Sequence, residues 1–281
     1  MGAQDDDKIR SESKADASPK MEGLRALCAC GARSQRRASS GCCTPVRDTP
    51  LERPDLAIYS QQERIAAGAE PSWDSPDIVT NNWSPFRLLE EARITVRNLS
   101  PSTAAVNGVV HYYTSPFGIG TRRQLRLSQM VNLGPAQQAQ LVFPLHQEVL
   151  SGDPRVGVHI VIEHPHDADP VNNAGSQVHD GAYTSESGRS FDVQIPVLND
   201  SPEARQIDLA ILSTDLVATL SVSSRLFAPF EQINTTLHID VPAFLAGSSS
   251  GVINRAVTVV GRVAATGELL GGVTRLVRID N

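Results

Sequence analysis

The sequence predicts an all-β protein in which two tandem Ig-like β-sandwich domains follow an N-terminal extension. Apolar residues alternate with other residues over short runs, at 94–98, 156–163 and 207–211. A period of two is typical of strands that bury one face and expose the other. Stretches rich in turn-forming residues separate the runs, and the whole pattern occurs in both halves of the chain. Many short strands with regular turn signals favour the sandwich architecture.

Composition sets the size of the fold and limits its partners. The chain has 281 residues, 40% of them hydrophobic, which is enough for one large domain or two sandwiches of ordinary size. The net charge of −6 gives no basic face for nucleic acid, so none is expected as a partner. No run of 18 apolar residues is present, so we expect no transmembrane segment. Residues 1–20 are acidic and polar, and they lack the basic start and apolar core of a secretory signal.

Residues 1–53 are predicted to be a disordered, basic, cysteine-containing extension. They are rich in Ser, Ala, Asp, Arg and Gly and poor in β-branched and aromatic residues. All the cysteines of the chain lie here, namely Cys28, Cys30, Cys42 and Cys43. Their spacing is not that of a common zinc site. Disulfide closure, metal capture and crosslinking between chains are open roles, and a reduced segment without a role is the alternative.

The first sandwich is expected over residues 54–175. Predicted strands lie at 55–59, 77–80, 91–98, 139–143 and 155–163, and residues 61–67 favour a helical turn. Residues 106–114 and 122–132 are predicted to pair as a hairpin around the turn at 115–120. The stretch 172–188 is polar and rich in Gly and Ser, which predicts a linker.

The second sandwich is expected over residues 189–281. Its predicted strands lie at 190–198, 206–212, 218–223, 234–240, 253–265 and 269–279. The segment IPVLNDSP at 195–202 repeats the pattern of ITVRNLSP at 94–101, with Asn and then Ser-Pro after an alternating strand. Two related modules in tandem are the simplest explanation.

Several segments of the first half resemble the bacterial Ig-like domain of the CARDB, or cell-adhesion-related, type. They are SPDIVT (75–80), ARITVRNLSPSTAAVNGVVHYY (92–113), NLGPAQQAQLVF (132–143) and GVHIVIEHPHDADPVNNA (157–174). That family opens with Pro-Asp and closes on an acidic hairpin that ends in Asn-Asn. Leu133-Gly134-Pro135 departs from the family's usual Pro-Gly turn. The resemblance covers residues 76–173 and implies surface, adhesive or modular binding roles, with no reaction. Residues 189–281 are similar to a second Ig-like or fibronectin-like module.

The acidic turn at 164–169 is a candidate metal site. The side chains of Asp167, Asp169 and Asn172 are candidate ligands for calcium, since hard cations prefer oxygen. His164 and His166 make the turn similar to the His-x-His motif of metallo-β-lactamase-like hydrolases, but Ala168 and Asp169 break that motif. A zinc hydrolase would need further ligands, for which His179 and Asp180 are candidates. The structural alternative is a pair of turns in which Asp and Asn side chains bond to their own backbone.

A second candidate site is an aromatic contact patch. Tyr112 and Tyr113 are neighbours on one predicted strand, and Phe117 lies at the tip of its hairpin, while Trp73 and Trp83 flank an early strand. Exposed aromatic side chains favour recognition, whereas burial in a core is the alternative. The Gly-x-Ser-x-Gly match at 247–251 lacks the helix that a hydrolase nucleophile elbow needs, so it predicts a flexible loop.

Together these features predict a non-catalytic structural or adhesive interaction protein, a subunit of a bacterial surface or extracellular assembly. We expect protein partners or self-association as a homo-oligomer, through exposed strand edges and loop tips. No cofactor is expected apart from the candidate calcium. A monomeric carbohydrate- or peptide-binding module and, third, a metal-dependent hydrolase are the alternatives.

Overall fold

The computed structural model describes residues 52–80, 91–144, 155–178, 183–186, 188–212, 216–241 and 252–280. In the first half of this part lie the helix α1 (Gln61–Ala66), the 3-10 turn η2 (Pro170–Asn172) and strands β1 (Leu56–Ala57), β2 (Ile78–Thr80), β3 (Glu91–Asn98), β4 (Ala105–Pro116), β5 (Gln124–Leu133), β6 (Gln138–Pro144), β7 (Val156–Glu163) and β8 (Ala174–Val178). The second half contains β9 (Tyr183–Glu186), β10 (Ser190–Leu198), β11 (Arg205–Ile211), β12 (Val217–Leu220), β13 (Ser224–Phe227), β14 (Gln232–Asp240), β15 (Val252–Val263) and β16 (Leu269–Asp280).

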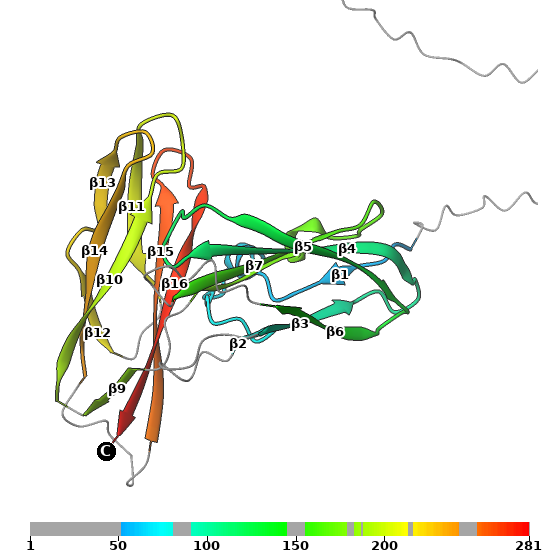
Figure 1. Ribbon diagram of the computed structural model, residues 1–281, viewed down its shortest axis with the longest axis horizontal. Coiled ribbons are helices and arrows are strands. Elements are labelled where there is room, and N and C mark those ends of the chain that lie inside the picture. Colours follow the sequence, from blue (N-terminus) through cyan, green and yellow to red (C-terminus); the bar gives the residue numbers. More distant parts are fainter. Residues whose placement is uncertain are drawn as a thin grey trace, which may run out of the picture. The chain divides into compact units, whose positions relative to one another are not determined.

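These strands form four sheets, two in each half (Figure 1). In the first half, β3 pairs with β1, β2 and β6, and the second sheet has the order β5-β4-β7-β8. In the second half, the sheets have the orders β10-β14-β12 and β13-β11-β15-β16-β9. Apart from the parallel pair of β9 and β16, the strands of these sheets pair antiparallel. The predicted all-β, tandem sandwich architecture is confirmed.

The alternation in the sequence places one face of each strand in a core. On β3, Ala92, Ile94, Val96 and Asn98 are buried, while Arg93 is exposed. A first core gathers around Ile94, Tyr112, Phe143 and Ile160, among others, and a second gathers around Ile195, Ile207, Leu237 and Val259. Each core fills the space that two sheets enclose, as a sandwich requires.

The predicted strands 91–98 and 190–198 are found with the same bounds. The predicted hairpin is present as β4 and β5, which pair from Ala105↔Leu133 to Thr114↔Gln124. The stretch 172–188 differs from the expected linker, because it contains β8, which pairs with β7, and β9. The run expected at 218–223 is interrupted, and two short strands, β12 and β13, join different sheets on either side of the break.

A buried asparagine closes one corner of the first sandwich. The Nδ2 group of Asn98 donates to the carbonyl oxygens of Thr103, Leu133 and Gly134, at 2.8, 3.3 and 3.0 Å. Its Oδ1 accepts from the backbone N–H groups of Asp55 and Ser100, at 3.1 and 3.2 Å. One side chain therefore joins the end of β3 to the β5–β6 turn and to the residue before β1.

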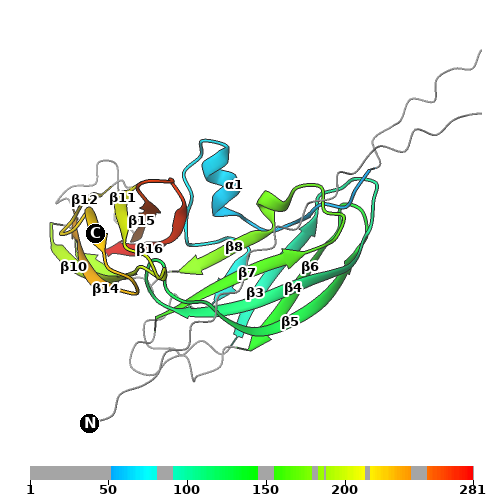
Figure 2. The same ribbon diagram turned by 90° about the horizontal axis from the view of Figure 1, so that it is seen from above.

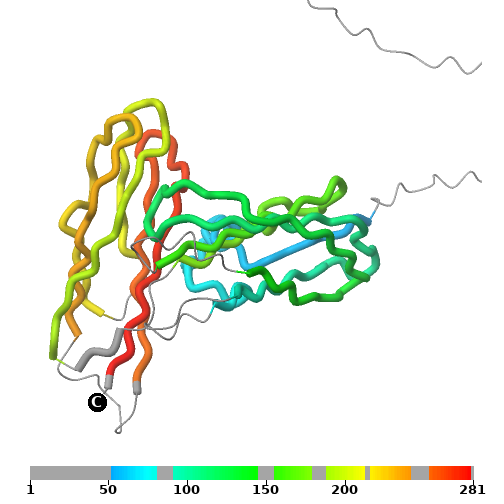
Figure 3. The backbone as a smooth tube through the Cα atoms, viewed as in Figure 1, coloured from blue at the N-terminus to red at the C-terminus, as the bar shows by residue number. Residues whose placement is uncertain are grey.

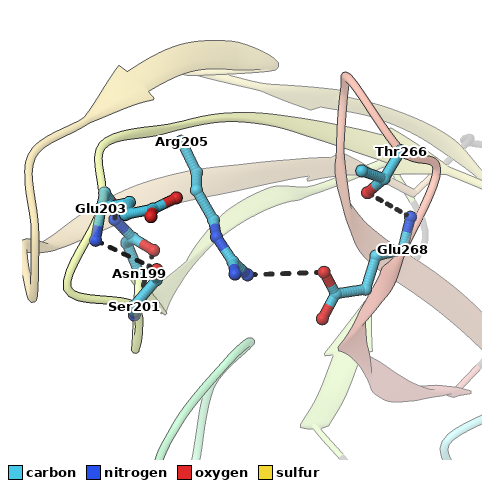
Figure 4. A network of polar contacts seen from close by, with 6 residues as sticks. All are labelled: Asn199, Ser201, Glu203, Arg205, Thr266 and Glu268. Carbon is cyan, nitrogen blue, oxygen red and sulfur yellow. Dashed lines mark hydrogen bonds and ion pairs between the residues drawn. The ribbon is translucent and has the colours of Figure 1, made fainter. Parts of the chain in front are cut away.

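The second sandwich repeats this corner at the positions that the sequence echo marks. Asn199 donates to the carbonyl oxygens of Glu203 and Ala228. Its side-chain oxygen accepts from the N–H of Ser201, and the Ser201 hydroxyl in turn accepts from the N–H of Glu203 (Figure 4). In the same view, Arg205 pairs with Glu268 at 3.4 Å, which links β11 to the β15–β16 turn.

The backbone around the two asparagines is repeated as well. Asn98 N–H donates to the carbonyl of Gln137, and Asn199 N–H donates to that of Glu231. Ala136 and Phe230, each one residue before these partners, both have a positive φ, 52° and 57°. Two corners that agree in side-chain bonds, main-chain bonds and unusual φ angles show that the halves share one construction.

The turn between β4 and β5 joins the first half to the second. Ile119 N–H donates to Pro196 O and Leu198 N–H donates to Ile119 O, so the turn forms a short bridge with β10 (Figure 3). Trp73 and Phe117 pack into the second core. A Cβ on Gly272 would lie 2.6 Å from the Trp73 ring, so this contact requires glycine there.

Candidate functional site

The longest exposed sheet edge of the first half is strand β5. It stands at the end of the order β5-β4-β7-β8 and, within the described ranges, pairs only with β4 (Figure 2). Its ten residues therefore present on their other side a row of backbone N–H and C=O groups that are available to another strand. The opposite end of this sheet differs, because α1 lies beside β8 (Figure 2).

Three large apolar side chains of β5 are exposed. The exposed fractions are 54% for Leu125, 44% for Leu127 and 69% for Met130. Single exposed apolar residues are common on protein surfaces, and here three of them lie along one edge strand. β5 therefore offers both backbone groups and apolar side chains for contact.

A β-bulge distributes these side chains over both faces of the sheet. The register shifts between Tyr112, which is opposite Leu127, and Tyr113, which is opposite Leu125. Directly opposed residues share a face, so Leu127 lies on the face of the buried Tyr112 and Leu125 on the outer face with Tyr113. An added strand would thus meet a leucine on either face.

Proteins protect edge strands with lysine, proline or a bulge. β5 has the bulge and one charged side chain, Arg126, but its sequence QLRLSQMVNL contains neither lysine nor proline. Two other long edge strands contain proline, since β6 ends on Pro144 and β10 contains Pro196. Among the described edge strands, β5 is the longest that contains no proline.

The charged residues in the sequence of β5 and the turn before it are all arginines. Residues 117–133 include Arg122, Arg123 and Arg126 and no Asp or Glu. Arg122 pairs with Asp200, and Arg126 donates to the hydroxyl of Thr114 at 2.8 Å. Arg123 lies away from this edge, because it lines a cavity with Gln61 and Ser176 on the side of α1 and β8.

The predicted aromatic patch does not form as a surface, which corrects that expectation. Tyr112 is fully buried and stacks on Phe143 with ring centroids 4.8 Å apart, and burial raises the pKa of its hydroxyl. Phe117 and Trp73 are buried in the second core, with the Arg155 guanidinium over the Phe117 ring. Tyr113 alone remains half-buried beside the β5 edge, and Trp83 lies outside the described residues.

The acidic turn is held by its own backbone. Asp167 accepts from the N–H groups of Leu56 and Asp169, and Asp169 accepts from Val171 N–H. Asn172 donates to the Asp55 carboxylate at 2.9 Å. The bonds from Asp169 and Val171 are the Asx-type bonds that the sequence offered as the alternative to calcium. The bonds with Leu56 and Asp55 fasten the turn to the entry of the first sandwich. Burial is the main reason that the pKa of Asp167 is raised.

Over the described ranges, no cluster of three or more His, Cys, Asp or Glu side chains has the geometry to hold a metal ion. The remaining candidates for metal, crosslinking or nucleophilic roles lie outside those ranges: Cys28, Cys30, Cys42, Cys43, His179, Asp180 and the loop at 247–251. Nor does a described helix have the length and hydropathy to cross a bilayer.

One buried polar group was not expected from the sequence. His159 on β7 lies between two hydroxyls, with Nε2 2.9 Å from Ser115 and Nδ1 2.9 Å from Ser176. Burial, followed by the nearby charge of Arg123, lowers its pKa well below the usual value. Both nitrogens contact hydroxyls and neither contacts a carboxylate, so the arrangement lacks the acid that orients a catalytic histidine.

No protein-family model matches the chain, and no curated protein matches its sequence. Among solved structures, it is similar to PapD-like domain 7 of human CEP192 (11% identity over 37% of this chain and 80% of that one, TM-score 0.27). Red sea bream transglutaminase matches 77% of this chain at 11% identity, TM-score 0.26, and the chain spans 32% of that enzyme. The CupB6 tip adhesin of Pseudomonas aeruginosa matches over 81% of this chain and 99% of the adhesin, at 9% identity and TM-score 0.23. Likenesses of this strength carry no argument about function.

Proposed function

We propose that the chain is a non-catalytic structural or adhesive interaction protein whose β5 edge accepts a strand from a protein partner. The observation that carries this proposal is the ten-residue strand β5, in which Leu125, Leu127 and Met130 are exposed. Among the described strands, it pairs on one side alone, with β4. Strand addition obtains affinity from main-chain hydrogen bonds and specificity from the alternating side chains.

The finer parts of the proposal rest on the sequence. The resemblance to the CARDB type over residues 76–173 supports membership in a bacterial surface or extracellular assembly. Its opening Pro-Asp acquires a structural role, because Asp77 forms a two-bond ion pair with Arg97, at 2.5 and 2.6 Å. The carbohydrate-binding alternative has less support, since it requires a line of exposed aromatic side chains and three of the five candidates are buried.

Site-specific photo-crosslinking of the full chain in its source cells tests the proposal. A photoreactive amino acid replaces Leu127 in one variant and Leu99, a leucine of similar exposure (52%) in the turn after β3, in the control. We expect a discrete crosslinked protein with the Leu127 variant alone. Equal crosslinking from both positions, or none from β5, would overturn the proposal.

A further inference from the structure

We infer that a cavity between the two sandwiches binds a small organic carboxylate, whose charge pairs with Arg123 and whose apolar body packs on the cavity walls. The cavity lies at the α1 and β8 end of the first sandwich. This site is separate from the β5 edge, and the inference does not depend on the partner proposed there.

Both sandwiches contribute walls to this cavity. The first contributes α1, through Gln61 and Ile65, and β8, through Ser176. The second contributes the turn between β15 and β16 and the strand ends beside it, through Arg262 and Leu269. Figure 2 shows α1 next to this turn. The enclosed volume is about 550 Å³, which is the size of a site for a small molecule.

Hydrogen bonds and core packing hold these walls in place. The N–H of Trp73 donates to the hydroxyl of Thr274 on β16 at 2.8 Å, and the Trp73 ring packs into the second core. The side-chain amide of Gln61 donates to the carbonyl oxygens of Ser72 and Ser176, at 2.8 and 2.7 Å. The segment that carries α1 is therefore bonded to both sandwiches, and the cavity is formed before a ligand enters it.

Arg123 brings a positive charge to the cavity that no described residue neutralises. Within the described ranges, its guanidinium has neither a hydrogen bond nor an ion pair, and the groups that interact with it electrostatically, Tyr113 and His159, are not carboxylates. The residue is exposed, yet the protein atoms around the guanidinium displace water from it and thereby lower its pKa. Such a cation is accessible to a ligand and pairs with an anion more strongly than a cation in open water does.

The other charged side chains of the cavity are already engaged. Glu268 is the one acid among the described lining residues, and it pairs with Arg205 at 3.4 Å. Arg262 donates to the carbonyl oxygen of Gly267 at 3.2 Å and keeps its charge. The lining therefore carries more arginine than acid, which favours an anionic ligand.

The shape of the cation and the apolar walls select the class of anion. The planar guanidinium of Arg123 presents paired N–H groups that match the two oxygens of a carboxylate. Ile65, Trp73 and Leu269 line the same cavity and offer apolar surface. An organic carboxylate satisfies both features, whereas an inorganic anion satisfies the charge alone.

The test titrates the full chain with three probes: cyclohexanecarboxylate, its neutral amide of nearly equal shape, and inorganic phosphate. The variant Trp83→Phe leaves Trp73, which lines the cavity, as the single tryptophan, so its fluorescence reports binding at this site. Isothermal titration calorimetry of the wild-type chain measures the same affinities independently. We expect the carboxylate to bind with Kd about 1 mM, an ordinary value for so small a molecule.

The carboxylate should bind about ten-fold more tightly than the amide or phosphate, because it alone supplies both the charge and the apolar body. Arg123→Gln should abolish this preference and leave the Tm of the ligand-free chain unlowered, since the charge it removes has no partner there. The control Arg93→Gln removes an exposed cation that pairs with Glu91 on β3, and it should keep the preference.

Several results would overturn the inference. One is the absence of saturable carboxylate binding up to about 10 mM. Others are an affinity for the amide or for phosphate that equals that for the carboxylate, and a preference that persists in Arg123→Gln. A marked fall in Tm for Arg123→Gln would show that the cation has a structural partner, which also contradicts the inference. None of these results bears on β5, which the crosslinking experiment tests separately.

Discussion

Replacement of Asn98 by alanine should destabilise the first sandwich strongly. The side chain is 1% exposed and makes five hydrogen bonds, three as donor and two as acceptor. A net hydrogen bond contributes about 1 kcal/mol, and a buried partner left without one costs more. Three of the five bonds are 3.1 Å or shorter, so the expected loss is about 3–5 kcal/mol.

Asn199 provides a matched comparison within the same chain. Its side chain makes three bonds, to Glu203, Ala228 and Ser201, at 2.8, 2.9 and 3.3 Å. By the same reasoning, Asn199→Ala should cost about 2–3 kcal/mol, less than the change at Asn98. The two variants should weaken different sandwiches, because each corner serves its own core.

Urea unfolding of the full chain, followed by circular dichroism, gives the change in the free energy of unfolding. Amide hydrogen exchange then assigns the loss to β3 and β6 or to β10 and β14. The reasoning would be refuted if Asn98→Ala lost less than about 1 kcal/mol, or if Asn199→Ala lost more than Asn98→Ala. Either result would show that these two side chains do not hold the corners closed.

Three further changes test other parts of the structure. Ala136→Gly should stabilise the chain by up to about 1 kcal/mol in thermal unfolding, because φ of 52° suits glycine, whereas the control Ala139→Gly on β6 should destabilise it; a loss at both positions would contradict this. Asp77→Asn should lower the free energy of unfolding, measured in urea, by about 2–3 kcal/mol, because it breaks the ion pair between the buried Asp77 and the partly exposed Arg97. An unchanged free energy of unfolding would show that the pair is dispensable. His159→Gln should remove a pH dependence of the stability. The imidazole of His159 binds a proton near pH 6.5 in the unfolded chain and only well below that pH in the folded chain, because burial lowers its pKa. The free energy of unfolding of the wild type therefore falls below pH 6.5, by up to about 1.4 kcal/mol per pH unit. If wild type and variant keep a constant stability difference between pH 7 and 5, the lowered pKa is wrong.

The parts of the fold that the sequence predicts well are those with local patterns. Strands 91–98 and 190–198 alternate cleanly, and their structural bounds match. The corner asparagines were visible as a repeated Asn–x–Ser–Pro pattern, because the same local geometry needs the same residues. Periodicity also indicated that residues 106–114 and 122–132 pair.

The parts that the sequence did not predict depend on contacts far along the chain. Strand β8 is small and polar, and its burial comes from partners such as Gln61, which bonds to Ser176, and Trp73, which accepts from Val178 N–H. The burial of Phe117 likewise requires the second core. That β5 is an edge is a property of strand order, so its exposed leucines could not be told from core residues by periodicity.

The claim that β5 is an open edge is tested most directly by residue-resolved amide hydrogen exchange on the full chain at low concentration. An uncovered edge strand predicts that alternate amides of β5 exchange quickly, while those of β7, which is paired on both sides, exchange at least about 100-fold more slowly. Protection of every β5 amide to the level of β7 would show that the edge is already covered, and it would contradict the proposed function.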